Sequence, residues 1–439
     1  MASRVSLPRH PVELDFDGEA IVAEEGEPIA FALIASGKVA LSRSPKLHRP
    51  HGPYCLRGGC DGCLLRVNGE PNVMSCLVPC RGGERVETQN VLGSRKMDLM
   101  QATDWFFPRG IDHHHFLAGV PAASYVVQKI ARHVAGLGRL PDDARPVDSA
   151  RREDVDVLVV GGGAAGLTVA LRLRAGRTTA SLKVLVADDG VSPGGSLLAR
   201  GASLPDLSSL DLYDRTTAAG IYEREVLLVR EKEAIVVRSR ALVLATGTHD
   251  GVVAFAGNDL PGVFSARAAA LLAQRDIAVG KKVGLFGTGP YSDAFRRKMG
   301  RRVQAVTVPP GASLVAEGRG RLTSIAIGAE PTSGPRRTSG KQSTAHHEVD
   351  ALLVEAPGAP SFELAEQAGA GVIFDAARGG YLPVTDSNGR ALARPGASDE
   401  PMFLWCAGEM SGTGPSLGAI EANAEAVALD VTRALASPR

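Results

Sequence analysis

The sequence predicts an α/β protein with two Rossmann-like, doubly wound nucleotide-binding folds, preceded by a small β-rich domain. A buried strand, a glycine-rich turn and a helix follow one another in VDVLVVGGGAAGLTVALRLRA, beginning at Val155. The same order recurs in KKVGLFGTGPYSDAFRRKM, beginning at Lys281. Strands that alternate with helices form parallel, doubly wound sheets, whereas the first ninety or so residues alternate apolar and polar side chains around turn residues.

Length and composition indicate a multidomain globular protein. A chain of 439 residues is too long for one ordinary core. With 44% hydrophobic residues, 22% charged residues and a formal net charge of +1, nothing favours nucleic acid or an anionic membrane as a partner. The sequence contains no signal-peptide pattern and no apolar run long enough for a transmembrane helix. We therefore expect a cytoplasmic protein with no transmembrane segment.

The first domain is expected to span residues 1–92. Asp17-Gly18 and Asn68-Gly69 each separate two strand-like runs and predict hairpins. A short helix is expected from Pro28. Residues 93–153 are expected to form a helical connector followed by a polar linker rich in proline and charge.

Four cysteines lie within the stretch YCLRGGCDGCLLRVNGEPNVMSC: Cys55, Cys60, Cys63 and Cys76. Their spacing is C-x4-C-x2-C-x12-C, and the first three match the plant-type [2Fe–2S] pattern with a remote fourth cysteine. Structural zinc usually takes two C-x-x-C pairs, disulfides are rare in the cytoplasm, and a redox pair would leave two thiols unexplained. The sequence favours [2Fe–2S], with zinc or no metal as alternatives.

Glycines between these cysteines are consistent with a cluster loop. Gly58, Gly59 and Gly62 lack a Cβ atom, so the loop can wrap tightly and bring backbone N–H groups to negatively charged sulfurs. Cys80 is a nearby spare thiol. It competes with Cys76 for the fourth position, and we favour Cys76.

The first glycine-rich turn fits G-x-G-x-x-G between a strand and a helix. In this motif the glycines allow a tight turn, close approach of a pyrophosphate and close packing of helix on strand. Asp188 ends the next strand, where a carboxylate can bind ribose hydroxyls. The predicted cofactor-binding residues here are Gly161, Gly163, Ala164, Ala165, Gly166 and Asp188.

Three further features favour FAD over NAD at this turn: the pair Gly194-Gly195, the strand-end Thr246-Gly247, and CAGEMSG ahead of a terminal helix. Together they resemble the flavoprotein disulfide-reductase superfamily. That resemblance implies a flavoprotein whose FAD-binding domain, here residues 154–250 and 356–439, is interrupted by an NAD(P)-binding domain, here residues 251–355. It also implies that Gly408 and Glu409 lie near the ribityl–phosphate part of FAD, although the superfamily more often has Asp at the latter position.

The second turn carries Gly287 and Gly289, but Ser292 replaces the third glycine. The strand that follows ends without an acidic residue for NAD or an arginine pair for NADP. NAD(P) binding and a retained fold without its ligand are both open at this turn. The flavin region contains no C-x-x-C, and Cys406 is expected to be a core residue.

The segments RSPKLHRPHG, PNV before Cys76, DWFFPRGIDHHHFLAGVP and AGLGRLP resemble the family of the sarcosine oxidase α subunit, hydrogen cyanide synthase, opine oxidases and dye-linked proline dehydrogenases. The retained cysteines place the chain with the cyanide synthase and opine oxidase branch. The chain stops after the FAD helix, so a folate-binding domain and folate chemistry are not expected. The run His113-His114-His115 is expected to pack or cap rather than bind a metal.

The family resemblance implies an electron-transferring FAD and [2Fe–2S] subunit of a multi-component amine or amino-acid dehydrogenase or oxidase. Oxidation would occur on a separate FAD subunit of D-amino-acid-oxidase type, which agrees with the lack of a recognisable substrate base in this sequence. One alternative is a stand-alone NAD(P)H-dependent flavin and iron–sulfur reductase. Another is a non-catalytic assembly subunit with vestigial nucleotide sites.

Overall fold

The computed structural model describes residues 1–43, 49–89, 91, 125, 149–176, 179–231, 233–328, 344–394 and 403–436. These ranges leave out most of the expected helical connector, the three adjacent histidines, and residues 44–48 within RSPKLHRPHG. The chain divides into two compact units. The first comprises 1–145, 253–287 and 296–354, and the second comprises 146–252, 288–295 and 355–439.

The amino-terminal part of the first unit is a five-stranded sheet, as its alternating sequence predicts. The strand order is β3-β2-β8-β6-β7, and both predicted hairpins are present. The elements are β2 (Pro11–Phe16), β3 (Glu19–Glu24), β6 (Leu64–Val67), β7 (Glu70–Met74), β8 (Arg85–Glu87) and α1 (Ile29–Ala35). Every residue of α1 is buried, so this helix forms the core of the small domain.

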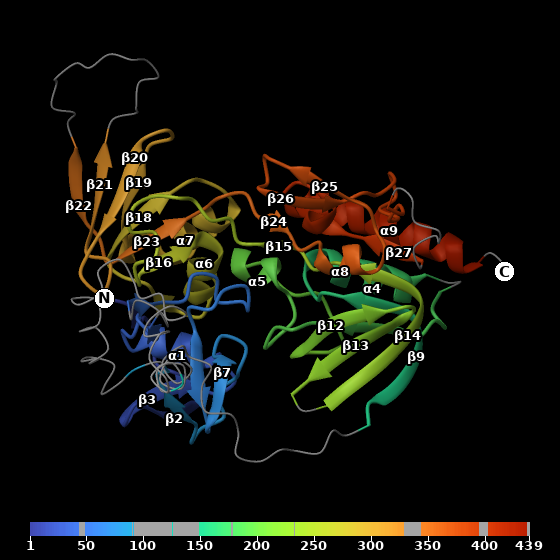
Figure 1. Cartoon of the computed structure of the whole chain (residues 1–439), viewed down its shortest axis with the longest axis horizontal. Helices are drawn as coiled ribbons and strands as arrows, with labels where there is room; N and C mark the ends of the chain where they lie inside the picture. The colour runs from blue at the N-terminus through green and yellow to red at the C-terminus, as the bar shows by residue number, and fades with distance from the viewer. Residues whose placement is uncertain are drawn as a thin grey trace. The chain divides into compact units, whose positions relative to one another are not determined.

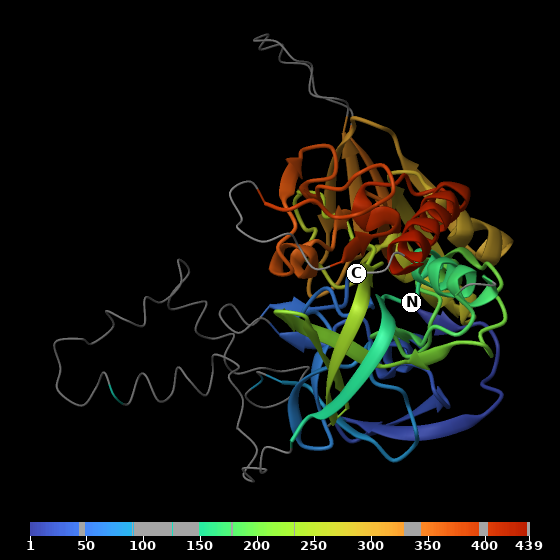
Figure 2. The same cartoon turned by 90° about the vertical axis from the view of Figure 1, so that its right-hand side faces the viewer.

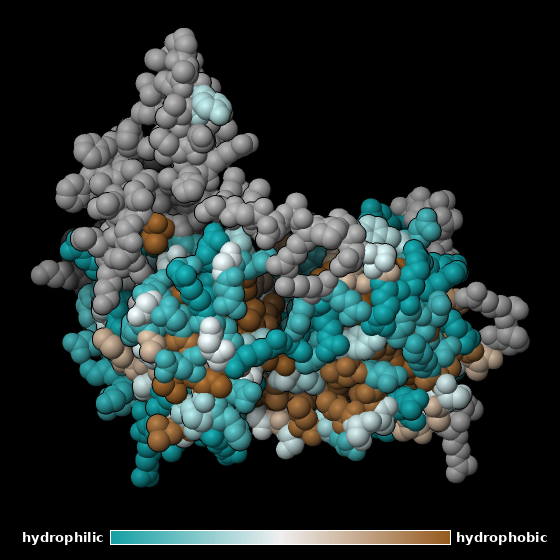
Figure 3. Space-filling view, turned by 90° about the horizontal axis from the view of Figure 1, so that it is seen from below, coloured by the Kyte–Doolittle hydropathy of each residue, from teal (hydrophilic) through white to brown (hydrophobic). Residues whose placement is uncertain are grey.

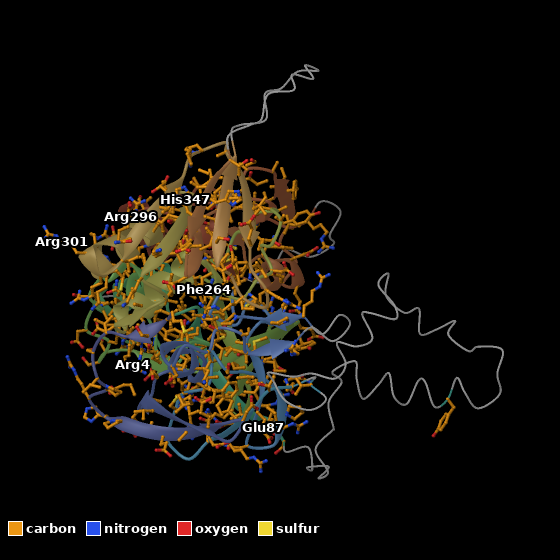
Figure 4. All side chains as sticks on the ribbon, turned by 90° about the vertical axis from the view of Figure 1, so that its left-hand side faces the viewer. Arg4, Glu87, Phe264, Arg296, Arg301 and His347 are labelled. Carbon is orange, nitrogen blue, oxygen red and sulfur yellow. The ribbon has the colours of Figure 1, made fainter. Side chains whose placement is uncertain are left out.

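The second part of the first unit is a parallel four-stranded sheet in the order β16-β23-β18-β19. Its elements are β16 (Val263–Ser265), α6 (Ala266–Gln274), β18 (Lys282–Phe286), β19 (Gln304–Val308) and β23 (Ala351–Val354). Helix α7 (Pro290–Met299) follows β18, and its residues up to 295 belong to the second unit. An antiparallel sheet of β20 (Ser313–Glu317), β21 (Ser324–Gly328) and β22 (Ala345–Glu348) adjoins it in sequence. Phe264 is fully buried, whereas Arg301 is exposed (Figure 4).

Within the first unit the two parts are joined directly. Strand β1 (Ser3–Arg4) pairs antiparallel with β17 (Ile277–Ala278), and the amino group of Met1 lies 2.9 Å from Asp350 Oδ1. The N–H group of Ser265, the residue that caps α6, donates to the carbonyl oxygen of Tyr54 at 2.9 Å. The loop that carries the first predicted cysteine is thereby attached to the parallel sheet.

The second unit is built on one large sheet whose parallel core follows the order β11-β10-β9-β14, with β27 parallel to the last three residues of β14, Leu242–Leu244. Strands β9 and β14 run side by side over most of their length (Figures 1 and 2). The elements are β9 (Arg151–Val160), α4 (Ala164–Ala175), β10 (Val184–Ala187), α5 (Ser196–Arg200), β11 (Asp211–Tyr213), β14 (Glu233–Leu244), β27 (Leu404–Cys406) and α9 (Leu417–Ala436).

Helices α4 and α9 cover one face of this sheet, where they share a core with Val157, Val243 and Trp405. On the other face a second apolar cluster includes Cys406, which is fully buried as expected. An antiparallel meander of β12 (Thr216–Tyr222), β13 (Glu225–Arg230) and β14 extends the sheet. The expected strand in ALVLATGTHD is thus the end of a twelve-residue strand.

No helix among the described residues is long and apolar enough to cross a membrane. The face seen in Figure 3 is largely hydrophilic, with apolar patches among the polar side chains.

Candidate functional site

The four clustered cysteines form two pairs. The Sγ atoms of Cys55 and Cys60 are 3.3 Å apart, and the thiols of Cys63 and Cys76 are hydrogen-bonded to each other. None of the six cysteines of the chain forms a disulfide, and all six are among the described residues. Nowhere in the described ranges do three His, Cys, Asp or Glu side chains converge as a single metal ion would require. Two pairs are the arrangement that suits two irons, because each iron of a [2Fe–2S] cluster takes two protein ligands.

Three of these four thiols have shifted pKa values. A hydrogen bond from Cys55 is the main cause that lowers the pKa of Cys60 to about 6, and burial acts against it. The pKa of Cys63 is also lowered, mainly by its hydrogen bond with Cys76. The pKa of Cys76 is raised by the same hydrogen bond and by burial. In each pair at least one thiol is more acidic than an ordinary cysteine, which favours its deprotonation when a metal binds.

The loop between the first cysteines is shaped by glycine. Gly58 has φ +78° and donates its N–H group to Cys76 Sγ at 3.2 Å. A Cβ atom at Gly62 would lie 2.0 Å from the carbonyl oxygen of Gly52, so no larger residue fits there. The loop is thus compact enough to enclose a small inorganic group, with Cys55, Cys63 and Cys76 almost fully buried.

Cys80 has different neighbours. Its backbone hydrogen-bonds with Glu27 and Gly26, and its thiol is fully buried. Burial is the largest cause that raises the pKa of this thiol, followed by the charges of Glu27 and Glu84. The structure therefore brings Cys76, rather than Cys80, to Cys63.

The first glycine turn lies between β9 and α4 in the second unit. Gly161 has φ +105°, and a Cβ atom there would lie 2.3 Å from the carbonyl oxygen of Ala245. A Cβ atom at Gly166 would lie 1.8 Å from the carbonyl oxygen of Gly161, which explains the close contact of helix and strand. Gly163 faces open space, with nothing within 4 Å of its Cβ position.

The N–H groups at the start of α4 are available to a ligand. Within the described part of the chain no group accepts a hydrogen bond from the N–H of Ala164 or Ala165. Such N–H groups at a helix N-terminus, next to a glycine without a side chain, form an anion-binding site. These donors fit the pyrophosphate of a dinucleotide.

The remaining residues predicted for this site surround the turn. Asp188 follows β10 and accepts from the N–H of Gly162 at 2.7 Å and of Gly190 at 3.0 Å. The N–H of Gly194 donates to the carbonyl oxygen of Gly162 at 2.7 Å, so the second glycine pair lies against the first turn. The two contacts of Gly162 thus bring Asp188 and Gly194-Gly195 to the turn, as the sequence predicts.

The carboxyl-terminal motif also reaches this turn. A Cβ atom at Gly408, which has φ +77°, would lie 2.7 Å from that of Ala165, and the Gly408 N–H donates to Asn423 Oδ1 at 2.7 Å. Glu409 follows within a 3-10 turn, η3 (Gly408–Ser411), ahead of α9. Thr246 Oγ1 donates to the carbonyl oxygen of Ser361 at 2.9 Å and contacts Met410 Sδ at 3.3 Å. Thr246-Gly247 and Gly408-Glu409 are thereby linked through neighbouring residues.

The second glycine turn, between β18 and α7, is filled differently. Ser292 is buried, and its Oγ atom accepts from Gly289 N at 3.2 Å and contacts Gly289 O at 3.1 Å. The carboxylate of Glu355 accepts from Tyr291 N at 3.0 Å and from Ser292 N at 2.7 Å. Sequence reasoning missed Glu355, although a carboxylate directly after the strand DALLV, at the edge where the turn lies, was a usable signal.

Comparison with known proteins matches residues 9–91 to a 2Fe-2S iron-sulfur cluster binding domain. The sarcosine oxidase subunit alpha of Rhizobium meliloti (strain 1021) is 28% identical over 451 aligned positions, which cover 91% of this chain and 45% of that protein. For the corresponding subunit of Corynebacterium sp. (strain P-1) the identity is 26%, over 58% of this chain and 26% of that protein. The chain therefore spans less than half the length of these relatives.

Two further comparisons cover the small domain and the whole fold. Hydrogen cyanide synthase subunit HcnA of Pseudomonas aeruginosa is 31% identical over 84 residues, which are 19% of this chain and 80% of that subunit. The crystal structure of L-proline dehydrogenase from P. horikoshii is 20% identical, with a TM-score of 0.69, and the match covers 99% of this chain and 76% of that one. The predicted fold class, an α/β dinucleotide-binding protein preceded by a small ferredoxin-like domain, is confirmed.

Proposed function

Because this chain belongs to the family of the sarcosine oxidase α subunit and hydrogen cyanide synthase, we propose that it is an electron-transferring flavin and iron–sulfur subunit. It would serve a multi-component dehydrogenase or oxidase that acts on an amine or amino acid of the sarcosine, proline, opine or glycine type. The observation that carries the proposal is the pairing of Cys55 with Cys60 and of Cys63 with Cys76 in a chain that also has an open dinucleotide turn.

The proposed ligands of the [2Fe–2S] cluster are Cys55, Cys60, Cys63 and Cys76. The N–H of Gly58 would donate to a ligand sulfur and so stabilise its negative charge. Burial of three of the four cysteines would keep water away from the cluster. A single zinc ion is disfavoured, because it needs its ligands around one point rather than in two pairs.

The proposed ligand of the first turn is FAD. The N–H groups of Ala164 and Ala165, which have no acceptor among the described residues, would bind its pyrophosphate, and Gly161, Gly163 and Gly166 would allow that approach. Asp188 would bind ribose hydroxyls, since it lies at the turn and a carboxylate oxygen can accept from more than one donor. Gly194-Gly195, Thr246-Gly247 and Gly408-Glu409 would complete the site. The proposed domain boundaries remain 1–92, 93–153, 154–250 with 356–439, and 251–355.

When bound, flavin accepts the two electrons of a hydride and a [2Fe–2S] centre carries one electron at a time. The chain's own residues would hold both groups and shield them, while a partner FAD subunit of D-amino-acid-oxidase type would oxidise the substrate. A cytoplasmic location is part of the proposal, since the four cysteines would have to remain reduced to bind iron.

An anaerobic titration of the purified full chain tests the proposal. We expect flavin absorbance, about two irons and two acid-labile sulfides per chain, and a paramagnetic signal after dithionite. Flavin bleaching is expected only with the partner subunit and an amine present. Holoprotein that contains flavin but neither iron nor sulfide would refute the relay, and rapid bleaching by NADH or NADPH alone would favour the stand-alone reductase. A chain without any chromophore would favour the assembly subunit.

A further inference from the structure

The carboxylate of Glu355 occupies the N-terminus of helix α7. One of its oxygens accepts the N–H of Tyr291 and the other accepts the N–H of Ser292. Both oxygens and both first-turn donors are therefore already in use. The side chain is held in place by two charge-assisted hydrogen bonds, which are among the stronger ones in proteins.

This position is where a dinucleotide fold binds its ligand. In such folds the pyrophosphate lies at the N-terminus of the helix that follows the glycine turn, and the second glycine lets it approach the backbone. Here a Cβ atom at Gly289 would lie 2.4 Å from Glu355 Oε1. The carboxylate thus fills the space that the second glycine leaves free.

The fold places this residue there through strand pairing. Strand β23 pairs parallel with β18, with Val354 opposite Phe286. Glu355 directly follows β23 and the glycine turn directly follows β18, so both lie at the carboxyl edge of the same sheet. This edge is the ligand-binding edge of open α/β sheets.

The two turns also differ in what binds the N–H groups at the start of the helix. At the first turn the N–H groups of Ala164 and Ala165 have no acceptor among the described residues, and the Cβ position of Gly163 is open. At the second turn Pro290, which has no N–H, takes the place of Ala164, and the N–H groups of Tyr291 and Ser292 bind an internal anion. A pyrophosphate would have to displace that anion and would be repelled by it.

We propose that Glu355 is a specificity-determining residue that closes the second nucleotide fold to NAD(P). Its carboxylate substitutes for the pyrophosphate, stabilises the helix and leaves the fold without a ligand. The chain then cannot draw electrons from NAD(P)H, whether or not it carries flavin. This inference concerns the second fold alone and is independent of the iron–sulfur and flavin proposal.

The test is calorimetric titration of the full-length chain with ADP-ribose, which carries the pyrophosphate but cannot reduce flavin. We expect Glu355→Ala to gain one binding site relative to the unchanged protein, with affinity raised at least about tenfold at that site. The first turn is the same in the variant and in the unchanged protein, so any additional site belongs to the second turn, even in a preparation without flavin. Glu363→Ala, which removes an exposed glutamate of the same unit, is the matched control and should gain none.

A second variant covers the case in which Glu355→Ala does not fold. Glu355→Ser keeps a hydroxyl that can cap one N–H of α7, and it should gain the same site. An equal number of sites in the unchanged protein and in the folded variants would overturn the proposal. Flavin content, recorded on each sample, reports the proposed function separately.

Discussion

The N–H group of Gly58 donates a hydrogen bond to the Sγ atom of Cys76 across 3.2 Å. This contact joins the loop after the first cysteine to the last of the four. It requires the left-handed backbone of Gly58, whose φ is +78°. A side chain there would also meet Leu77, whose Cδ1 atom lies 2.9 Å from the Cβ position.

Gly58→Ala is therefore expected to weaken iron retention. The left-handed backbone costs a residue with a Cβ atom roughly 1–2 kcal/mol, and the contact with Leu77 displaces the loop. Thermal unfolding and iron content would be measured together. Gly83→Ala is the matched control, because Gly83 has φ +82° and open space around it. It should lower the melting temperature comparably while iron content stays unchanged, and equal iron loss in both variants would contradict the prediction.

Replacing each clustered cysteine by serine tests the ligand set. Cys55→Ser, Cys60→Ser, Cys63→Ser and Cys76→Ser should each abolish the [2Fe–2S] absorbance and the signal after dithionite, because one iron would lose a thiolate. Cys80→Ser should retain both, since Cys80 lies among Glu27 and Glu84 rather than beside another cysteine. Loss of the cluster in Cys80→Ser with retention in Cys76→Ser would reverse the assignment of the fourth ligand.

Two glycines of the first turn should give opposite results. Gly161→Ala places a Cβ atom 2.3 Å from a rigid backbone carbonyl and should destabilise the fold itself. Gly163→Ala meets nothing in the protein but intrudes on the space assigned to the pyrophosphate. It should leave the melting temperature of the flavin-free chain nearly unchanged and weaken FAD binding about tenfold or more, or about 1.4 kcal/mol. Normal FAD binding by Gly163→Ala in a flavin titration would contradict this prediction.

The pH dependence of stability should depend on Glu153. Burial raises the pKa of Glu153, but hydrogen bonds from Lys183 and Tyr213 and the charge of Arg151 outweigh it and hold the pKa below the usual value of 4.5. A depressed folded pKa contributes stability above the unfolded pKa, and this stability is lost as the pH falls through the folded pKa.

Glu153→Gln should therefore reduce stability by about 1–2 kcal/mol at neutral pH, and the difference should disappear in acid below the folded pKa. Glu233→Gln serves as control, because Glu233 is 48% exposed and its ion pair with Arg151 contributes little. Melting curves from neutral to acidic pH would measure both. A difference for Glu153→Gln that grew in acid would contradict the assignment.

Much of the fold was predictable, because local patterns carried it. Asp17-Gly18 and Asn68-Gly69 turn their hairpins as expected, and both strand–turn–helix motifs form. The meander of β12, β13 and β14 was missed, since alternation in a half-exposed antiparallel sheet is a weaker signal than a buried apolar run.

Long-range contacts were beyond sequence reasoning. The spacing predicted that four cysteines act together, but it did not predict that Cys63 pairs with Cys76. The environment that separates Cys80 from them depends on how the chain folds back near Glu27. The carboxylate of Glu355 reaches α7 only because β23 pairs with β18 across many intervening residues. Neither the surroundings of Cys80 nor the contact of Glu355 with α7 can be predicted from a local sequence pattern.

The two compact units are interleaved along the chain, and this has a consequence for biosynthesis. As the polypeptide leaves the ribosome, strand β1 emerges long before β17, the strand with which it pairs. The carboxyl end of β14 must wait for β27, which follows only at Leu404–Cys406. Neither unit can complete its fold in the order of synthesis. A nascent chain would expose the unpaired carboxyl end of β14 until β27 is made, and chaperone protection of that edge would favour a good yield.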